Sequence, residues 1–330
     1  LIGPNQIPVS NFSITKSDIN SESGQVCTIG EKPNIASYDA VSSVEMAFGE
    51  VITNIASAYI EDLGKIKLSA NWMANSSNNK ELQSLYNSVD RLSSLCSQCN
   101  IVIPVGKDSL SMSTKWQDKK PKKVESPMSL VLSAFSSIKD VNKYVTPQAL
   151  KNSDLYLIDL GNNKNRMGGS ALHQILNKNK NIPPKIESIK NLTSYFECSQ
   201  ELIKKNLLNA YHDRSDGGLI TTLIEMAFAS NMSVILNKFE CNDYIKFLFN
   251  EELGGVFAIS KKDENNFLKI IKKYKLDGNI YHLGRLKVEN NPKLILKQLN
   301  YRESLCSLRK NWSELSYLIQ SERDNKKTAY

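Results

Sequence analysis

Two short polar segments far apart in the chain contain the side chains best suited to chemistry. In the first, Glu50 and Asn54 lie four residues apart in a stretch with helical apolar spacing. Residues at i and i+4 share one face of a helix, so the carboxylate and the amide oxygen can face one cation. An ordinary surface pair is the alternative, but the neighbouring Gly49 and Ala56 favour close approach by a polar group. Hard oxygen donors without a His or Cys cluster favour Mg²⁺ over zinc.

The second segment is Tyr211–Gly218, with the sequence Y-H-D-R-S-D-G-G, ahead of another apolar helical stretch. Asp213 and Asp216 could simply cap that helix, and the paired glycines could form only a turn. Two carboxylates, the Ser215 hydroxyl and a Gly-Gly turn are together more typical of a place where backbone N–H groups and a metal hold phosphates. We therefore predict a magnesium–nucleotide site. We expect His212 to be structural, because no Ser or Cys nucleophile is evidently paired with it.

A third polar group follows the apolar run Ile101–Val105. Lys107, Asp108 and Ser109 are predicted to lie in the turn of a hairpin-like unit after this strand. Two interpretations are equally favoured: the charges are incidental to a turn, or they contact a phosphate or a metal. We include the three side chains among the candidate nucleotide-binding residues.

Composition and charge restrict the class of protein. The 330 residues are 41% hydrophobic and 23% charged, which is ordinary for a globular protein and enough for two domains. The chain has no run of about 18 apolar residues that would predict a membrane span. The net charge of +8 comes from scattered Lys residues rather than from a basic stripe with aromatic side chains. Nucleic-acid binding is therefore not predicted, whereas a basic balance suits anionic small substrates.

The six cysteines are dispersed, and Cys96 and Cys99 form a C-x-x-C pair. A redox or zinc role is one interpretation. The other is packing, because both thiols continue the helical apolar series that includes Leu85, Val89 and Leu92. We favour packing, since a four-sulfur zinc site would need a second such pair. We expect reduced thiols, no disulfides and a cytoplasmic location.

Apolar spacing predicts the main elements. A strand is predicted over Val9–Thr15, and helices over Asp39–Tyr59, with Asp39 as N-cap, and over Glu81–Cys99. Buried strands are predicted at Leu130–Phe135 and Leu155–Leu160.

The polar stretch between these two strands contains Pro147 and predicts a domain boundary near residue 145. We therefore expect two domains, residues 1–145 and 146–330. The chain opens at Leu1 inside a predicted strand, so we expect a piece of a longer protein whose first strand is missing.

Several distinctive blocks occur in order along the chain. They are Ile29–Lys32 (I-G-E-K), Ala47–Asn54 (A-F-G-E-V-I-T-N), Lys67–Met73 (K-L-S-A-N-W-M), Ile103–Met112 (I-P-V-G-K-D-S-L-S-M), Gly168–Leu172 (G-G-S-A-L), Ala210–Leu219 (A-Y-H-D-R-S-D-G-G-L) and Phe249–Gly254 (F-N-E-E-L-G). With these blocks, the chain resembles the second half of the synthetase core of phosphoribosylformylglycinamidine synthase, a purine-pathway amidotransferase, in its large, single-chain type. The resemblance extends over essentially all 330 residues.

The resemblance implies an α+β fold like that of aminoimidazole ribonucleotide synthetase, with an N-terminal α+β domain followed by a C-terminal α/β domain. It also implies an ATP- and Mg²⁺-dependent ligase, which converts formylglycinamide ribonucleotide, ATP and glutamine, as a source of ammonia, to the amidine, ADP, phosphate and glutamate. Its partners would be a first synthetase half and a glutaminase domain of the same polypeptide. We expect the isolated chain to be inactive with glutamine.

The resemblance implies that Glu50, Asn54 and Asp213 are metal ligands, and that Ser10 and Ser215 contact the nucleotide. One position departs from the family pattern: Asn11 stands where an aspartate metal ligand is usual. Asparagine keeps an oxygen but loses a charge, and Mg²⁺ binding depends on carboxylates. We therefore expect Asn11 to be a weaker ligand, or the site to hold one magnesium fewer.

Two other functions fit the same residues. The first is a stand-alone ATP-using synthetase of the same superfamily, working as a homodimer. The second is a nonenzymatic scaffold half, in which bound ADP only stabilises the fold. The sequence leaves open whether the nucleotide site is catalytic or structural.

Overall fold

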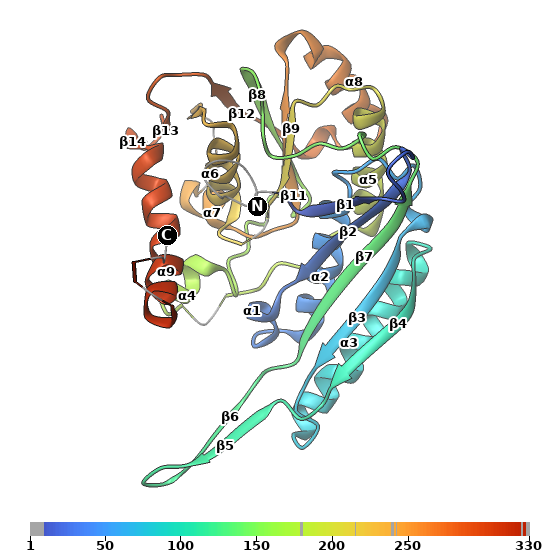
Figure 1. Cartoon of the computed structure of the whole chain (residues 1–330), viewed down its shortest axis with the longest axis vertical. Coiled ribbons are helices and arrows are strands. Elements are labelled where there is room, and N and C mark those ends of the chain that lie inside the picture. Colours follow the sequence, from blue (N-terminus) through green and yellow to red (C-terminus); the bar gives the residue numbers. More distant parts are fainter. Residues whose placement is uncertain are drawn as a thin grey trace.

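The computed structural model describes residues 10–178, 181–214, 216–238, 241, 243–324 and 326–327. These residues form two large sheets, one in each half of the chain and each packed against helices, and a separate sheet of two strands (Figure 1). None of the helices in these ranges is long and apolar enough to cross a lipid bilayer.

The first sheet has the strand order β1-β2-β7-β3-β4 within the described residues. Its pairs are antiparallel except for β3 and β4, which run parallel. Helices α2 and α3 belong to the same half of the chain, and α2 contacts β2 and β7. The elements are β1 (Phe12–Lys16), β2 (Gly24–Glu31), α1 (Pro33–Ala36), α2 (Ala40–Ile55), β3 (Lys67–Met73), α3 (Asn79–Gln98), β4 (Val102–Ser109) and β7 (Ser129–Ile138).

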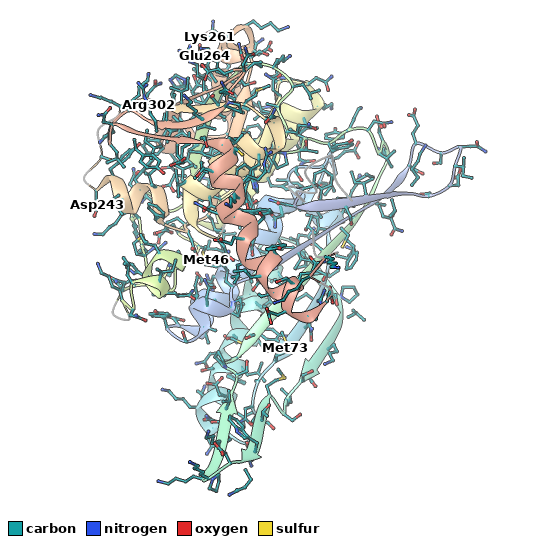
Figure 2. The ribbon with its side chains drawn as sticks, turned by 60° about the vertical axis from the view of Figure 1, so that its left-hand side comes forward. Met46, Met73, Asp243, Lys261, Glu264 and Arg302 are labelled. Atoms are coloured by element: carbon teal, nitrogen blue, oxygen red, sulfur yellow. The ribbon has the colours of Figure 1, made fainter. Side chains whose placement is uncertain are left out.

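A separate ribbon of two strands, β5 (Ser113–Gln117) and β6 (Pro121–Glu125), projects from the end of this half (Figures 1 and 2). Its strands are almost wholly exposed.

The second sheet has the strand order β14-β13-β10-β12-β8-β11-β9 within the described residues. Its pairs are antiparallel except for β10 and β13. One hydrophobic cluster of this half includes side chains of α6 and α7, while α5 and α8 contribute to the cluster shared with the first half. The elements are β8 (Ser153–Asp159), α4 (Ala171–Ile175), α5 (Ile189–Lys204), β9 (Ala210–Asp213), α6 (Gly218–Ser230), β10 (Ser233–Leu236), α7 (Tyr244–Phe249), β11 (Gly254–Ile259), α8 (Glu264–Lys273), β12 (Ile280–Lys287), β13 (Lys293–Leu296), β14 (Tyr301–Ser304) and α9 (Leu305–Arg323).

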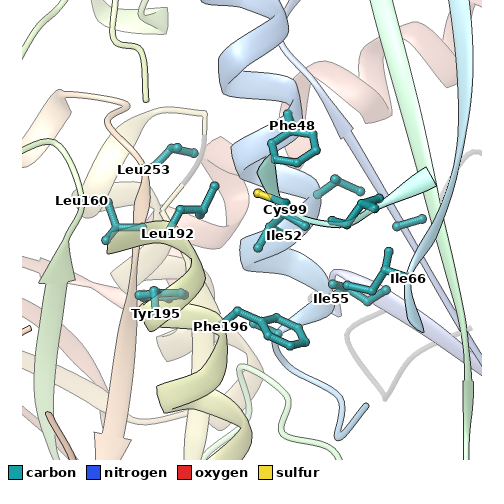
Figure 3. Close-up of a cluster of buried hydrophobic side chains, with 14 of the residues drawn as sticks. Phe48, Ile52, Ile55, Ile66, Cys99, Leu160, Leu192, Tyr195, Phe196 and Leu253 are labelled. Carbon is teal, nitrogen blue, oxygen red and sulfur yellow. The ribbon is translucent and has the colours of Figure 1, made fainter. Parts of the chain in front are cut away.

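Helix α2 connects the two halves because it is buried along almost its whole length. It begins where predicted, since the Asp39 carboxylate accepts a hydrogen bond from Ser42 N at 2.9 Å. Its apolar side chains face both the first sheet and α5, so one hydrophobic cluster extends across both halves. Figure 3 shows this packing between Phe48, Ile52 and Ile55 of α2 and Leu192, Tyr195 and Phe196 of α5.

Polar contacts reinforce this packing around α2. Glu45 of α2 accepts a hydrogen bond from Ile186 N at 3.0 Å, and the carbonyl of Thr53 accepts one from the Tyr211 hydroxyl at 2.6 Å. These contacts hold the helix that carries Glu50 and Asn54 against the strand that ends at Asp213.

The predicted turn at Lys107, Asp108 and Ser109 is wrong. These residues form the end of β4, where Asn71 pairs with Lys107 and Met73 with Ser109 in a parallel register. Their polar composition favours a turn locally, but β3 offers backbone hydrogen bonds that extend the strand through them. Such a partner, about 35 residues away in the chain, leaves no local signal in the sequence.

The Gln200 side chain of α5 is a buried amide that joins the two halves. Its Oε1 accepts hydrogen bonds from Ile60 N at 2.6 Å and Glu61 N at 3.2 Å. Its Nε2 donates to Ala58 O at 3.0 Å and Ala56 O at 3.3 Å. The amide thus satisfies the backbone that follows α2 and fixes the end of that helix.

We predict that Gln200→Met lowers the free energy of unfolding by about 2–4 kcal/mol, because buried backbone groups lose their partners while side-chain volume is kept. Urea unfolding followed by circular dichroism measures the change. The matched control is Gln98→Met on the exposed end of α3, where the amide contacts only Ser94, and we expect a change within about 0.5 kcal/mol. Equal effects of the two substitutions would contradict the role of Gln200.

Candidate functional site

A cavity of about 400 Å³ lies where β1, β2, α2 and the end of β9 meet. It brings together Glu50, Asn54 and Asp213, the three side chains that the sequence analysis proposed as metal ligands. Ser10 and Asn11 also line it, so the cavity gathers every candidate metal ligand and one of the candidate nucleotide contacts. Its remaining lining residues are Phe12, Ser13, Cys27, Thr28 and Ile29.

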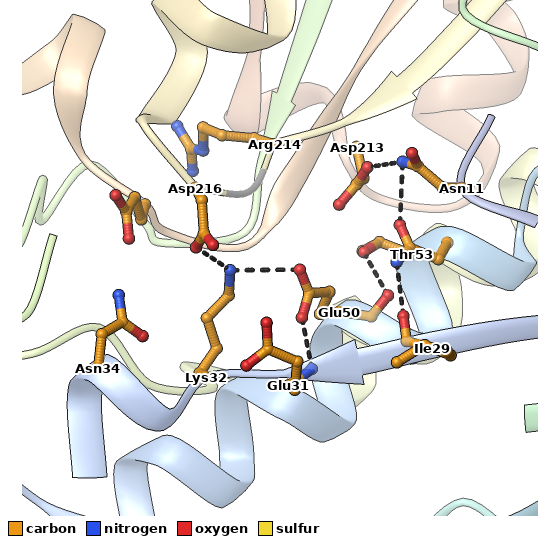
Figure 4. Close-up of polar contacts among 12 residues, drawn as sticks. Asn11, Ile29, Glu31, Lys32, Asn34, Glu50, Thr53, Asp213, Arg214 and Asp216 are labelled. Atoms are coloured by element: carbon orange, nitrogen blue, oxygen red, sulfur yellow. Dashed lines mark hydrogen bonds and ion pairs between the residues drawn. The ribbon is translucent and has the colours of Figure 1, made fainter. Parts of the chain in front are cut away.

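Asn11 bridges the side chains from the two halves of the chain (Figure 4). Its Nδ2 donates to Asn54 Oδ1 at 3.2 Å and to a carboxylate oxygen of Asp213. Asn54 is fixed in turn, because its Nδ2 donates to Ile29 O at 2.9 Å. Asn11 therefore acts here as a hydrogen-bond donor between the two other predicted ligands.

Glu50 is held on both of its carboxylate oxygens. Oε2 accepts a hydrogen bond from Glu31 N at 2.7 Å, and Oε1 lies 3.2 Å from the ammonium of Lys32. Burial raises the pKa of Glu50 to about 7, in spite of Lys32, and the nearby Asp213 carboxylate adds to the increase. The two carboxylates thus repel each other across the cavity, and a bound cation would relieve that repulsion.

The Gly217-Gly218 pair is needed for its backbone conformation. Both glycines have left-handed φ angles, +81° and +74°, and Gly217 is the N-cap of α6 without a side-chain capping bond. Asp213 and Asp216 are therefore not helix caps. The turn also points Gly217 N at Glu251 Oε1, at 2.8 Å. Ser215 lies outside the described residues, so its predicted nucleotide contact stays a prediction.

His212 is buried behind the cavity. Its Nε2 lies 2.9 Å from Glu225 Oε2, and its Nδ1 lies 3.2 Å from Asp213 Oδ1. Burial lowers the pKa of His212, but the hydrogen bonds and charges of Asp213 and Glu225 outweigh this and raise the pKa to about 9. The histidine therefore orients Asp213.

The donors around the cavity fit one hard divalent cation. Asp213 Oδ2 is buried and has no hydrogen-bond partner, so it needs a positive charge or a donor. Glu50 supplies a second carboxylate, and Asn54 and Asn11 carry amide oxygens, which suits Mg²⁺. In the part of the chain that is described, no three His, Cys, Asp or Glu side chains are grouped closely enough to hold a metal, so such a site depends on the amides. Bound there, Mg²⁺ would supply charge neutralisation for a polyphosphate.

Lys107, Asp108 and Ser109 do not join this group. They lie on β4, at the opposite edge of the first sheet from β1, and are not among the lining residues. The Lys107 ammonium donates to the Ser109 hydroxyl within the strand. A ligand contact for these residues stays a prediction and would use the far edge of the sheet.

The sequence analysis missed Lys32 as a member of the site. Its ammonium is 2% exposed and lies 2.6 Å from Asp216 Oδ1 as well as near Glu50. The available signal was a lysine directly after β2, a strand with one buried face, where a charged side chain needs a partner. The nearby Glu251 binds backbone, since its Oε1 accepts a hydrogen bond from Ala171 N at 2.8 Å.

The C-x-x-C pair shows the packing that the sequence analysis favoured. Cys96 and Cys99 are free and buried in the hydrophobic core. Burial raises the pKa of both thiols to about 11, which makes them poor nucleophiles and poor metal ligands.

Comparison with known protein families defines the fold of the chain. Residues 1–137 match the model of the FGAR-AT PurM_N-like domain, and residues 156–297 match the C-terminal domain of AIR synthase related proteins. The chain therefore has the two-domain AIR synthase-like fold, with the N-terminal domain followed by the C-terminal domain, as the sequence analysis expected.

Solved structures share this fold at low sequence identity. PurL of Thermotoga maritima complexed with FGAR has a TM-score of 0.67 and 10% identity, over 91% of this chain and 48% of that one. T. maritima PurL complexed with ADP has a TM-score of 0.64 and 10% identity, over 91% and 46%. AaThiL complexed with AMPPCP and TMP has a TM-score of 0.57 and 12% identity, over 88% and 90%. The chain spans about half the length of the PurL chains that it matches.

We predict that the stability of the metal-free protein falls as pH rises through the titration of His212. The folded state holds this proton more tightly, with a pKa of about 9 against an ordinary 6.5, so the stabilisation is complete below about pH 6.5 and is lost by about pH 9. The loss amounts to about 3 kcal/mol. The raised pKa of Glu50 has the same effect at lower pH. It lowers the stability of the folded protein as pH rises from the ordinary pKa of 4.5 to about 7.

Urea unfolding in EDTA across this pH range measures the effect. His212→Gln should flatten the curve above pH 6.5, whereas His282→Gln, on the partly exposed β12, should leave it unchanged. A parent protein with a flat profile between about pH 6.5 and 9 would contradict the prediction.

Proposed function

We propose that this chain is a magnesium–nucleotide-binding half of a purine-biosynthetic ligase. This ligase would convert formylglycinamide ribonucleotide, ATP and glutamine, by way of ammonia, to formylglycinamidine ribonucleotide, ADP, phosphate and glutamate. The observation that carries the proposal is the convergence of Glu50, Asn54 and Asp213 on one cavity. The matching structures of PurL in complex with FGAR and with ADP support the substrate class.

In this proposal, Glu50, Asp213 and Asn54 hold the metal, with Asn11 beside them. Ser10 would contact the nucleotide, because it lines the same cavity. The metal would neutralise the phosphates, and the hydrogen bonds from Glu31 N and His212 would keep the carboxylates in position.

A partner half of the same polypeptide fits the outer face of the first sheet. This face is opposite α2 and carries exposed apolar side chains, including Ile29 at 54%, Phe135 at 42% and Val105 at 60%. The strand register aligns Ile29 with Ser133, Ser133 with Ser69 and Ser69 with Val105, and Phe135 lies two residues from Ser133, so these side chains share one face of the sheet. We propose that the first synthetase half covers it and that a glutaminase domain supplies ammonia. The proposed location of the assembly is the cytoplasm, and the proposed domain boundary is near residue 145.

Two alternative functions have distinct experimental outcomes. A homodimeric stand-alone synthetase would turn over ATP with ammonia and the ribonucleotide without any other chain. A scaffold half would bind Mg–ADP, with a higher melting temperature, but substitutions in its cavity would leave turnover by the intact ligase unchanged. The proposed ligase half requires the partner half for turnover and does not release glutamate from glutamine alone.

We predict that Glu50→Gln and Asp213→Asn each weaken Mg–ADP binding by at least about tenfold, a loss typical of disturbed metal coordination. Both substitutions keep the side-chain shape and remove a negative charge that the cation needs. Isothermal titration calorimetry measures the affinity. Glu61→Gln, at an exposed ion pair with Lys65, is the matched control and should leave the affinity unchanged. Retained binding in both cavity variants would contradict the metal assignment.

We predict that Asn11→Asp tightens Mg–ADP binding and destabilises the metal-free protein. The new carboxylate adds a ligand, but without a cation it faces Asp213 in place of a hydrogen-bond donor. Calorimetry with Mg–ADP and thermal unfolding in EDTA measure the two effects. The exposed Asn142→Asp serves as the control for added charge. Equal Mg–ADP affinity in the parent and in Asn11→Asp would reject the prediction.

A further inference from the structure

The ammonium of Lys32 lies between the two halves of the molecule. Its side chain follows β2 and is 2% exposed, and its backbone carbonyl is held by Ser43 Oγ at 2.6 Å. The ammonium lies 3.2 Å from Glu50 Oε1, in the first half, and 2.6 Å from Asp216 Oδ1, in the second (Figure 4). One cation therefore contacts both carboxylate-bearing segments.

The surroundings of Lys32 are strongly negative. Besides Glu50 and Asp216, the carboxylates of Glu31 and Glu251 interact with it electrostatically. Burying an ammonium is costly unless it is paired, and here the carboxylates supply that pairing. The charge is thus held in place by the groups that it neutralises.

The contacts of Lys32 restrict the geometry of the proposed metal site. Glu50 has Lys32 on one oxygen and Glu31 N on the other, so its carboxylate plane is set by two contacts. Asp216 lies three residues after Asp213, the last residue of β9. Because Lys32 contacts Asp216 as well as Glu50, the chain that follows Asp213 is tied to the second carboxylate of the cavity.

We propose that Lys32 is a positioning residue that sets the separation of Glu50 and Asp213 and thereby selects for Mg²⁺ over larger cations. The inference rests on the proposed function, since it assigns a role within that nucleotide site. Mg²⁺ requires near-octahedral geometry at about 2.0–2.1 Å, whereas Ca²⁺ accepts flexible geometry at about 2.3–2.6 Å. Loosening the pair of carboxylates therefore harms Mg²⁺ binding more than Ca²⁺ binding.

The test measures ADP affinity of the full chain by calorimetry in Mg²⁺ and in Ca²⁺. We expect Lys32→Met to weaken Mg–ADP binding roughly 10–100-fold and Ca–ADP binding less than about threefold. Lys32→Arg keeps a cation between the carboxylates and should restore most of the preference for Mg²⁺. Asp216→Asn removes one contact at a side chain that is 62% exposed, so it tests the same link with little risk to folding. We expect Asp216→Asn, like Lys32→Met, to weaken Mg–ADP binding more than Ca–ADP binding.

Lys65→Met is the matched control, because Lys65 forms an exposed ion pair with Glu61 at 2.6 Å away from the cavity. It should change neither affinity. Equal losses in Mg²⁺ and Ca²⁺ for Lys32→Met and Asp216→Asn would mark a merely structural ion pair and overturn the inference. So would a Lys32→Arg variant that behaves like Lys32→Met. If the unsubstituted protein bound no ADP, the proposed function itself would fail, which is a different result from unchanged selectivity.

Discussion

The burial of α2 on both sides is the constraint on which the rest of the structure depends. The helix packs against the first sheet and against α5 of the second half, so a single hydrophobic cluster extends through both. Such burial leaves few places on the helix for polar side chains. Glu50 and Asn54 line the cavity, where they can still bind a ligand. The same packing that stabilises the fold therefore fixes two donors of the site relative to Asp213.

A few side chains balance the charge of the two carboxylates in the cavity. Glu50 and Asp213 line the same cavity, while Lys32, His212 and the Asn11 amide supply hydrogen bonds or positive charge. This arrangement keeps buried carboxylates satisfied on most of their oxygens and leaves Asp213 Oδ2 available. A site of this kind can bind one cation. Its selectivity among divalent cations depends on how firmly the carboxylates are held.

Local signals in the sequence predicted the parts of the fold that local physics controls. The helix after Asp39 and the strand before Asp159 follow from apolar spacing and capping. The site residues Glu50, Asn54 and Asp213 could be selected because oxygen donors at helical spacing and beside a Gly-Gly turn are unusual in an apolar context. The turn predicted at Lys107 failed, since its strand conformation comes from pairing with β3.

By itself, the sequence determined several of the helices and strands and the residue types that can bind a metal, because helical periodicity, capping and side-chain chemistry act over a few residues. The AIR synthase-like fold followed from the resemblance of its sequence blocks to a known family. Only the tertiary structure decided which of those residues meet. It joined Asn11 to Asp213, placed Lys32 between Glu50 and Asp216, and left Lys107 on the opposite edge of the sheet. Such meetings depend on how sheets and helices pack across hundreds of residues, and no local pattern records that packing.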